Sequence, residues 1–475
     1  MTTTENLYKL FLQHPLISTD TRKIAAGSLF FALKGDKFDA NTFAGQAIEE
    51  GAAYAIIDNP AYQVNEKYIL VDDTLAALQD LARHHRRQLT IPVIGLTGTN
   101  GKTTTKELIN SVLSQRYKTQ ATQGNLNNHI GVPLTILTIN SSHQIAVIEM
   151  GANHQKEIEL LCSLAQPTHG LITNVGKAHL EGFGGVEGVK KGKGELYDYL
   201  GSTVGKVLTW KVGSRQLLNS QDVAFINSDN QVLREMQEAR KLNNVVFYGA
   251  QTLHNLVSGK LTENSPYLTL QWTNNASDKR HKVKTQLTGA YNLDNILAAI
   301  CIGVYFDLTD NEVNKGVESY RPQNNRSQIV QTETNTLICD YYNANPSSMF
   351  VAIENIGKID AKRKVLILGD MFEMGDEAAA EHEAVIKKAM DTFVDERIFI
   401  GKEFYEASPE VRESESPEAK IVLPLLELSP TNRHAICYRT AEDAIAGLKA
   451  NPIKNSTILI KGSRGMALER LVGLF

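Results

Sequence analysis

Residues 91–113, IPVIGLTGTNGKTTTKELINSVL, decide the fold. An apolar run leads into a glycine-rich turn and then a helical pattern, which is the strand–loop–helix order of a phosphate-binding loop. In such a loop backbone N–H groups face phosphate oxygens, Lys102 neutralises the terminal phosphates and Thr103 offers a hydroxyl to Mg2+. The strict pattern requires glycine where this chain has Leu96. We therefore interpret the motif as a variant loop that binds ATP or GTP.

Strand-like and helical patterns alternate on both sides of this loop, which predicts an α/β fold. With 475 residues the chain has room for about three domains. We predict a small α/β N-terminal domain (1–88), a central P-loop ATPase domain with a parallel sheet (89–320) and a doubly wound, Rossmann-like C-terminal domain (321–475). Within the central domain, residues 205–210 resemble a buried parallel strand, and residues 245–287 resemble an antiparallel excursion.

Composition excludes several classes of protein. Hydrophobic residues make up 42% and charged residues 21%, as in ordinary globular domains, and the net charge is -4. This balance argues against a nucleic-acid-coating protein, and we expect no nucleic-acid partner. A secretory signal and a membrane-length apolar run are not evident, so we expect a cytoplasmic protein without membrane insertion. The four cysteines are widely spaced, which indicates reduced thiols rather than disulfides or a metal site.

Phosphoryl transfer needs metal ions, so acidic or imidazole groups at the ends of strands are candidate ligands. Glu149 ends one apolar run, and His179 follows another, near Asn174, which could position phosphate or metal-bound water. Each of these residues also has a structural interpretation, as a solvated strand-end acid, a structural histidine or a capping amide. Lys193 cannot bind Mg2+ as an ammonium. It could contact substrate anions, react with carbon dioxide to form a carbamate, or belong to a solvated basic cluster.

Seven motifs together resemble the Mur ligases of peptidoglycan synthesis, and the resemblance covers essentially the whole chain. They are TGTNGKTTT (97–105), IEMGANHQKEIELL (148–161), ITNVGKAHLEGFGGVEGVKKGKGELY (172–197), LTGAYNLDNILAAI (287–300), DYYNANPSSM (340–349), LILGDMFEMGDEAAAEH (366–382) and LIKGSRGMALE (459–469). The fifth and sixth are most similar to the member type that joins D-alanyl-D-alanine to UDP-N-acetylmuramoyl-tripeptide.

This resemblance implies an ATP-dependent amide ligase that works through an acyl phosphate, with ATP and Mg2+ as cofactors. It also implies a UDP-binding N-terminal domain. Because the ligands must come from the central domain and from segments beyond Arg326, we predict that the third domain closes over the nucleotide, and we expect a monomer. By analogy the catalytic residues are Lys102, Glu149, His179 and Lys193, and the metal ligands are Thr103, Glu149, His179 and a carbamylated Lys193. The implied nucleotide contacts are Gly98, Thr99, Asn100, Gly101, Lys102, Thr103, Thr104, Asn174, Asn292, Asn295, Arg326, Asp340 and Asn343. Tyr342 and Asn345 would face the cleft, and Lys461 and Arg464 would present charge to substrate carboxylates.

Two positions depart from the family pattern. Tyr291 stands where many relatives have histidine, and Ala40-Asn41 replaces a glycine-histidine pair, so the adenine and uridine contacts stay open. Two rival functions also stay open, namely another Mur or folylpolyglutamate-type amide ligase and a non-catalytic nucleotide switch. The sequence does not choose between diaminopimelate and lysine in the acceptor tripeptide.

Overall fold

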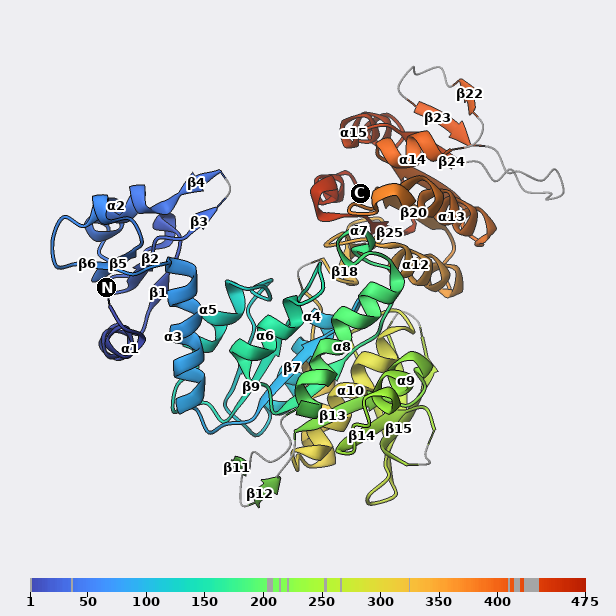
Figure 1. Ribbon diagram of the computed structural model, residues 1–475. Helices are drawn as coiled ribbons and strands as arrows, with labels where there is room; N and C mark the ends of the chain where they lie inside the picture. Colours follow the sequence, from blue (N-terminus) through green and yellow to red (C-terminus); the bar gives the residue numbers. More distant parts are fainter. Residues whose placement is uncertain are drawn as a thin grey trace.

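The computed structural model describes residues 2–35, 37–202, 208–212, 215–219, 222–251, 254–264, 267–323, 325–408, 411–413, 419–422 and 435–475. It contains three large sheets, each with its own helices (Figure 1). In the view of Figure 1, the N-terminal part lies at the upper left of the central part and the C-terminal part lies at its upper right. The prediction of a three-domain α/β fold is confirmed, whereas the boundaries at residues 88 and 320 stay predictions.

The N-terminal part has a four-stranded parallel sheet with the order β1-β2-β5-β6. Its strands are β1 (Ile17–Ser18), β2 (Leu29–Phe31), β5 (Tyr54–Ile57) and β6 (Tyr68–Leu70), with a separate hairpin of β3 (Lys34–Gly35) and β4 (Phe38–Asp39). Its helices are α1 (Thr4–Gln13), α2 (Ala44–Glu49) and α3 (Thr74–Gln88), with 3-10 turns η1 (Thr21–Lys23), η2 (Ala40–Phe43) and η3 (Pro60–Tyr62). Asn41 is buried and donates hydrogen bonds to Asp39 and Asp58, so at this position it holds the local fold together.

Helix α3 attaches the N-terminal part firmly to the central part. The buried guanidinium of Arg86 donates to the carbonyl oxygens of Ala165 and Gln166, at the C-terminal end of a central helix. On the same helix, His85 Nε2 is hydrogen-bonded to the carbonyl of Ile139 at 2.7 Å. These bonds satisfy carbonyls that a helix end leaves without partners, and they restrict movement of α3 relative to the central sheet.

The central sheet has nine strands in the order β17-β16-β15-β14-β13-β10-β7-β9-β8. Helices α4, α10 and α11 pack on one face, and α3, α5, α6 and α8 pack on the other. The strands are β7 (Val93–Thr97), β8 (Thr119–Ala121), β9 (Ile145–Glu149), β10 (His169–Ile172), β13 (Val223–Asn227), β14 (Val245–Gly249), β15 (Asn255–Glu263), β16 (Thr269–Asn274) and β17 (Lys279–Lys284). The helices are α4 (Lys102–Leu113), α5 (Gly131–Leu137), α6 (Glu157–Ala165), α7 (Leu180–Phe183), α8 (Val186–Ser202), α9 (Gln231–Ala239), α10 (Asn292–Tyr305) and α11 (Asp310–Ser319).

Two details of the predicted central sheet are wrong. Residues 205–207 lie outside the described residues, and β11 (Leu208–Val212) pairs antiparallel with β12 (Arg215–Asn219) in a separate hairpin. The parallel position beside β10 belongs to β13, whose five residues are all buried, as expected for a strand of a parallel sheet that is covered on both faces. The antiparallel excursion begins later than predicted, since β14 and β15 are still parallel and only β15–β17 form the meander.

The C-terminal sheet has eight strands in the order β18-β19-β25-β20-β21-β24-β23-β22, and the five from β19 to β24 are parallel. They are β18 (Gln328–Gln331), β19 (Thr336–Asp340), β20 (Lys364–Gly369), β21 (Glu396–Ile400), β22 (Val411–Glu413), β23 (Ala419–Val422), β24 (Ala435–Tyr438) and β25 (Thr457–Lys461). The helices are α12 (Pro346–Lys358), α13 (Ala378–Asp391), α14 (Lys402–Ala407) and α15 (Ala441–Ala450), with 3-10 turns η4 (Gly375–Glu377), η5 (Arg464–Met466) and η6 (Leu468–Leu474). Within the described ranges, none of the helices combines the length and apolar character needed to cross a bilayer.

Candidate active site

The phosphate loop lies between β7 and α4, as predicted, and two of its glycines have positive φ angles. Gly98 has φ +147° and Gly101 has φ +78°, which L side chains rarely adopt. A Cβ at Gly98 would lie 2.0 Å from the hydroxyl of Thr173, and one at Gly101 would lie 2.7 Å from Oδ1 of Asn295. Both positions therefore require glycine for conformational and steric reasons.

The loop is held in shape by the segment that follows β10. The backbone N–H of Asn100 donates to Oδ1 of Asn174, and Nδ2 of Asn174 donates back to the carbonyl of Asn100, each at 3.0 Å. Thr173 also donates to this carbonyl, at 2.6 Å, and Thr99 is hydrogen-bonded to the backbone of Gly176. Asn174, predicted to position phosphate or metal-bound water, is thus placed where it fixes the conformation of the loop.

Lys102 directs its ammonium into the loop. Its Nζ donates to the carbonyls of Gly98 and Thr99, at 2.8 and 3.0 Å. Burial is the main cause that lowers the pKa of Lys102 to about 8; Glu149 opposes this shift and the nearby charge of Arg326 contributes to it. Anionic phosphate would add further negative charge beside this ammonium and would favour its charged form.

Glu149 provides the clearest evidence that the site fits a hard cation. Its side chain is buried at the end of β9, and its Oε1 accepts hydrogen bonds from the hydroxyl of Thr103 (3.2 Å) and Nδ2 of Asn127 (2.8 Å). The other oxygen, Oε2, is buried and has no hydrogen-bond partner within the described residues. An unpaired buried carboxylate oxygen is costly, and a Mg2+ ion prefers oxygen ligands of this kind. Thr103 and Glu149 therefore fit the predicted metal role.

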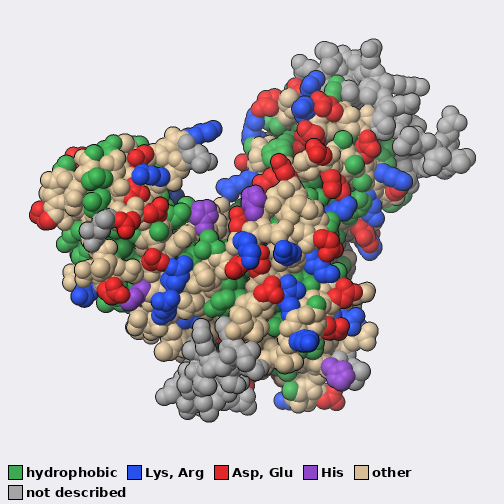
Figure 2. Space-filling model, viewed as in Figure 1, with side chains coloured by type: hydrophobic (Ala, Val, Ile, Leu, Met, Phe, Trp, Pro, Cys, Tyr) green, Lys and Arg blue, Asp and Glu red, His purple; other side chains and the backbone are tan. Residues whose placement is uncertain are grey.

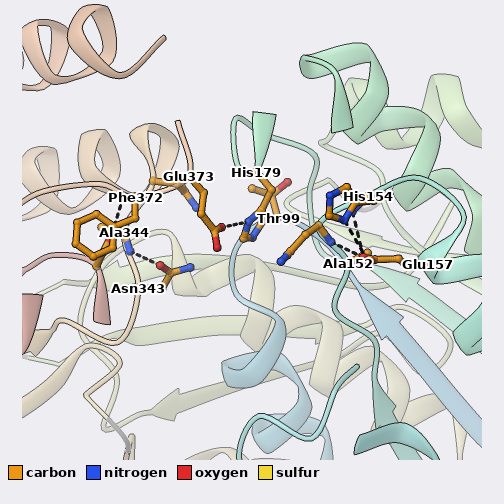
Figure 3. A network of polar contacts seen from close by, with 12 residues as sticks. Thr99, Ala152, His154, Glu157, His179, Asn343, Ala344, Phe372 and Glu373 are labelled. Atoms are coloured by element: carbon orange, nitrogen blue, oxygen red, sulfur yellow. Dashed lines mark hydrogen bonds and ion pairs between the residues drawn. The ribbon is translucent and has the colours of Figure 1, made fainter. Parts of the chain in front are cut away.

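His179 lies at the junction of the central and C-terminal domains. Its Nδ1 is hydrogen-bonded to Oε2 of Glu373, which comes from the loop after β20 (Figure 3). Burial lowers the pKa of His179, Lys102 and Lys193 add to the shift, and Glu373 opposes it. The imidazole is thus favoured in its neutral form with Nδ1 engaged, which leaves Nε2 available as a ligand atom.

Lys193 is a buried amine in α8 rather than part of a solvated basic cluster. Its Nζ donates to the carbonyl of Ala152 at 3.0 Å and lies 4.9 Å from the centroid of the Phe183 ring. Burial lowers the pKa of Lys193 well below its ordinary value, and the charge of Lys102 adds to this shift. A neutral amine is the form that reacts with carbon dioxide, so the surroundings favour the carbamate interpretation over the solvated one.

Helix α10 supplies the two predicted asparagines next to the loop. Oδ1 of Asn295 accepts from the hydroxyl of Thr105, and its Nδ2 donates to Asn292, which in turn donates to the carbonyl of Thr288. The hydroxyl of Tyr291 is hydrogen-bonded to Ser327 at 2.5 Å, so this departure from the family pattern connects the central domain to the start of the third.

The C-terminal domain contributes a charged cluster to the same cavity. The guanidinium of Arg326 lies 3.9 Å from the ring centroid of Tyr342, and its Nε has no hydrogen-bond partner among the residues described. Lys461 is buried and donates to Oδ2 of Asp340 at 2.8 Å and to the carbonyl of Asn343. Asp340 and Lys461 thus neutralise each other, which argues against a free Lys461 charge for a substrate carboxylate.

A cavity of about 850 Å3 between the central and C-terminal domains brings these groups together. Figure 2 shows a broad hollow between the N-terminal and C-terminal parts of the molecule. The predicted residues that line it are Thr99, Asn100, Gly101, Lys102, Thr104, Glu149, Asn174, His179, Asn292, Asn295, Arg326, Asp340, Tyr342, Asn343, Asn345 and Lys461. Gly98, Thr103, Lys193 and Arg464 lie outside this lining. Across the part of the chain that the structure describes, no three His, Cys, Asp or Glu side chains form a ready metal cage.

Sequence reasoning missed one residue of the site and the role of another. Asn127 donates to Glu149, and the asparagine-rich run NLNN (125–128) was the available signal. Asn345 was placed in the cleft, but its role was not anticipated. Its Nδ2 donates to Oδ1 of Asn100 at 2.8 Å, and its own Oδ1 caps α12 through the N–H of Ser348. A contact that spans 245 positions leaves no local signal in the sequence.

Comparisons with known proteins decide the family. The Mur ligase family catalytic domain matches residues 15–86, the Mur ligase middle domain matches residues 96–303, and the Mur ligase glutamate ligase domain matches residues 325–464. A relative from Bacillus subtilis (strain 168), named UDP-N-acetylmuramoyl-tripeptide–D-alanyl-D-alanine ligase, is 33% identical over 96% of this chain and 92% of its own length. The chain belongs to the Mur ligase family. The prediction of an ATP-dependent ligase of peptidoglycan precursor synthesis is therefore confirmed.

Solved structures agree with this assignment of the Mur ligase fold. A crystal structure of MurF from Acinetobacter baumannii superimposes with a TM-score of 0.79, at 28% identity, and the match covers 96% of this chain and 92% of that one. MurF from Thermotoga maritima in complex with ADP has a TM-score of 0.77 at 24% identity, over 97% of this chain and 96% of that one. At 24% identity, the similarity to the Thermotoga maritima structure supports the fold alone.

Proposed function

We propose that this Mur ligase uses ATP and Mg2+ to join D-alanyl-D-alanine to UDP-N-acetylmuramoyl-tripeptide. The observation that carries the proposal is the cavity of about 850 Å3, which places the phosphate loop opposite residues of the third domain. The name of the Bacillus subtilis relative and the motifs DYYNANP and LGDMFEMG support this choice of substrates. We also propose that the protein works in the cytoplasm as a monomer.

The chemistry requires activation of the carboxylate, because an amine does not displace oxide from it. A terminal carboxylate oxygen of the tripeptide attacks the γ-phosphorus of ATP, and the bond from that phosphorus to the β–γ bridging oxygen breaks. ADP leaves, and the product is an acyl phosphate. The neutral amine of the dipeptide then attacks the acyl carbon, the nitrogen releases one proton to solvent, and the tetrahedral intermediate expels phosphate to leave an amide.

The residues of this chain contribute mainly by positioning and by electrostatic stabilisation. Lys102 would transfer its hydrogen bonds from the loop carbonyls to the moving phosphoryl group. Thr103 and Glu149 would hold one Mg2+, and His179 with carbamylated Lys193 would hold a second. Bound Mg2+ would supply neutralisation of the phosphate oxygens. The buried Nε of Arg326, which has no hydrogen-bond partner among the described residues, suits an anion such as the nucleotide phosphates.

Release of ADP, measured with and without each substrate, tests the proposal. We expect ADP and phosphate in equal amounts only when tripeptide and D-alanyl-D-alanine are both present, with the pentapeptide product identified by mass. A rate of ADP release that does not depend on either substrate would favour the alternative function of a non-catalytic nucleotide switch. ADP release with a free amino acid in place of the dipeptide would favour another amide ligase. Parallel assays with diaminopimelate-containing and lysine-containing tripeptides would identify the natural acceptor.

A further inference from the structure

Lys106 is a fully buried lysine that the chemistry described above does not use. It lies in α4 three residues after Thr103, so the two side chains share one side of the helix. Its Nζ donates to the carbonyl of Thr122 at 2.6 Å and pairs with Oε1 of Glu107 at 2.7 Å. The side chain of Glu107 is 37% exposed, so its charge stays partly in water while the charge of Lys106 does not.

Burial of this ammonium group is a costly way to fill space in the core. An apolar side chain of similar length would fill the same space without removing a charge from water. It could not supply a hydrogen bond with a fixed direction. The bond from Lys106 joins α4 to Thr122, the residue that follows β8. The role of Lys106 is therefore to be found at Thr122.

Thr122 connects Lys106 to the main chain of Glu149. Its hydroxyl oxygen accepts from the backbone N–H of Glu149 at 2.9 Å, and its own N–H donates to the carbonyl of Val147 at 3.0 Å. Thr122 is buried, so water does not compete for these bonds. The position of the Glu149 backbone at the end of β9 thus depends on where Thr122 is held.

Helix α4 consequently restrains Glu149 at two points. Thr103 donates directly to the carboxylate at 3.2 Å, whereas Lys106 acts on the backbone through Thr122. The segment that begins at Thr122 continues to Asn127, which donates to the same carboxylate at 2.8 Å. A metal site needs its ligand atoms placed within about 0.5 Å, and the groups around a ligand set that placement.

We propose that Lys106 and Thr122 are positioning residues that orient Glu149 toward Mg2+. Their roles rest on the proposed function, because they require Glu149 to bind the metal. Neither residue lines the cavity of about 850 Å3, so neither contacts a substrate there. Their loss should weaken the part of nucleotide binding that depends on Mg2+, and it should leave the binding of tripeptide and dipeptide unchanged.

Calorimetry with a non-hydrolysable ATP analogue, with and without Mg2+, tests these roles without relying on turnover. The Kd without Mg2+ divided by the Kd with Mg2+ measures the contribution of the metal, and we call this quotient the metal ratio. Lys106→Met keeps an unbranched side chain without the charge, and it should lower the metal ratio about tenfold. The Mg2+ concentration for half-maximal turnover should rise by a similar factor. The KM values for tripeptide and D-alanyl-D-alanine should stay within about twofold.

Thr122 provides a second and milder test. Thr122→Val has nearly the same shape but no hydroxyl, so it should also lower the metal ratio about tenfold. Thr122→Ser keeps the hydroxyl and should hold the metal ratio within about twofold of the unaltered value. Because Lys106 and Thr122 act along one path, the Lys106→Met, Thr122→Val double variant should lose less than the product of the two single effects. The comparison of valine with serine is sufficient if Lys106→Met fails to fold.

Lys364→Met is the matched control. Lys364 is a buried lysine of the C-terminal domain, and its Nζ donates to the carbonyl of Gly357 at 2.9 Å. Its substitution should lower the Tm through the loss of a buried hydrogen bond, and it should leave the metal ratio unchanged. A purely structural role for Lys106 would give this same pattern.

Three results would overturn the inference. The first is a folded Lys106→Met enzyme that behaves like Lys364→Met, with a lower Tm and an unchanged metal ratio. The second is a Thr122→Val enzyme whose metal ratio equals that of Thr122→Ser. The third is a double variant that loses the full product of the single effects, which would place the two residues on separate paths. An unaltered enzyme that binds the analogue equally well with and without Mg2+ would instead contradict the metal role in the proposed function.

Discussion

Substitution of Glu149 by glutamine separates a metal-binding role from a structural one. The carboxylate is buried, and one oxygen accepts from Thr103 and Asn127 while the other has no partner within the described residues. Glutamine keeps the shape and can accept both hydrogen bonds through its amide oxygen. The substitution therefore removes the charge and little else.

The expected change in stability is small because two effects oppose each other. Two hydrogen bonds lose their charge assistance, which costs about 1 kcal/mol each. Burial of a carboxylate costs several kcal/mol, and glutamine relieves that cost, although the attraction to Lys102 is lost as well. We expect the free energy of unfolding without nucleotide to stay within about 2 kcal/mol of the unaltered value. Catalysis should lose about 3–4 kcal/mol of transition-state stabilisation, which is roughly a 10²–10³-fold lower kcat.

The assay combines urea unfolding, with and without MgATP, with turnover at several Mg2+ concentrations. Glu195→Gln is the contrasting control, because this buried carboxylate accepts from the backbone N–H groups of Lys156 and Glu159 at 2.6 and 2.9 Å. It should lose about 1–3 kcal/mol of stability and keep most of its turnover. Our reasoning is wrong if Glu149→Gln retains normal turnover and Mg2+ dependence, or if it destabilises the protein more than Glu195→Gln does.

Three further predictions follow from buried or bridging groups. Burial lowers the pKa of His169 to about 3. As the pH falls below about 6.5, the unfolded protein therefore binds a proton at this histidine that the folded protein does not bind. Roughly 4 kcal/mol of the free energy of unfolding is lost by about pH 3. His169→Phe should flatten the dependence of the unfolding free energy on pH in that range, and an unchanged slope would contradict the pKa. Carbon-13 NMR of protein equilibrated with labelled bicarbonate should show a carbamate signal that Lys193→Arg removes; identical spectra would favour the bare amine. Asn345→Asp keeps an oxygen to cap α12 but loses the donor to Asn100, so the KM for ATP should rise about fivefold, equivalent to about 1 kcal/mol, at unchanged Tm. A normal KM would show that the contact is incidental.

The sequence by itself determined the elements whose causes are local. The apolar run before Gly95, the glycine turn and the helix at Lys102 follow one another in the chain, and backbone conformation is fixed largely by such neighbours. The strand-end position of Glu149 could be predicted for the same reason. The alternation of strands and helices also predicted three α/β sheets, because parallel strands need crossover helices.

Only the tertiary structure decided which of these groups meet and in what state. The burial of Lys193, the pairing of Lys461 with Asp340 and the contact between Asn345 and Asn100 depend on packing between segments far apart in the sequence. The misplaced strand at 205–210 has the same origin, since a short apolar run specifies a strand but not its partner. Desolvation and charge pairing act through space, so the pKa values and the unpaired polar atoms that define the site arise only after the domains have packed together.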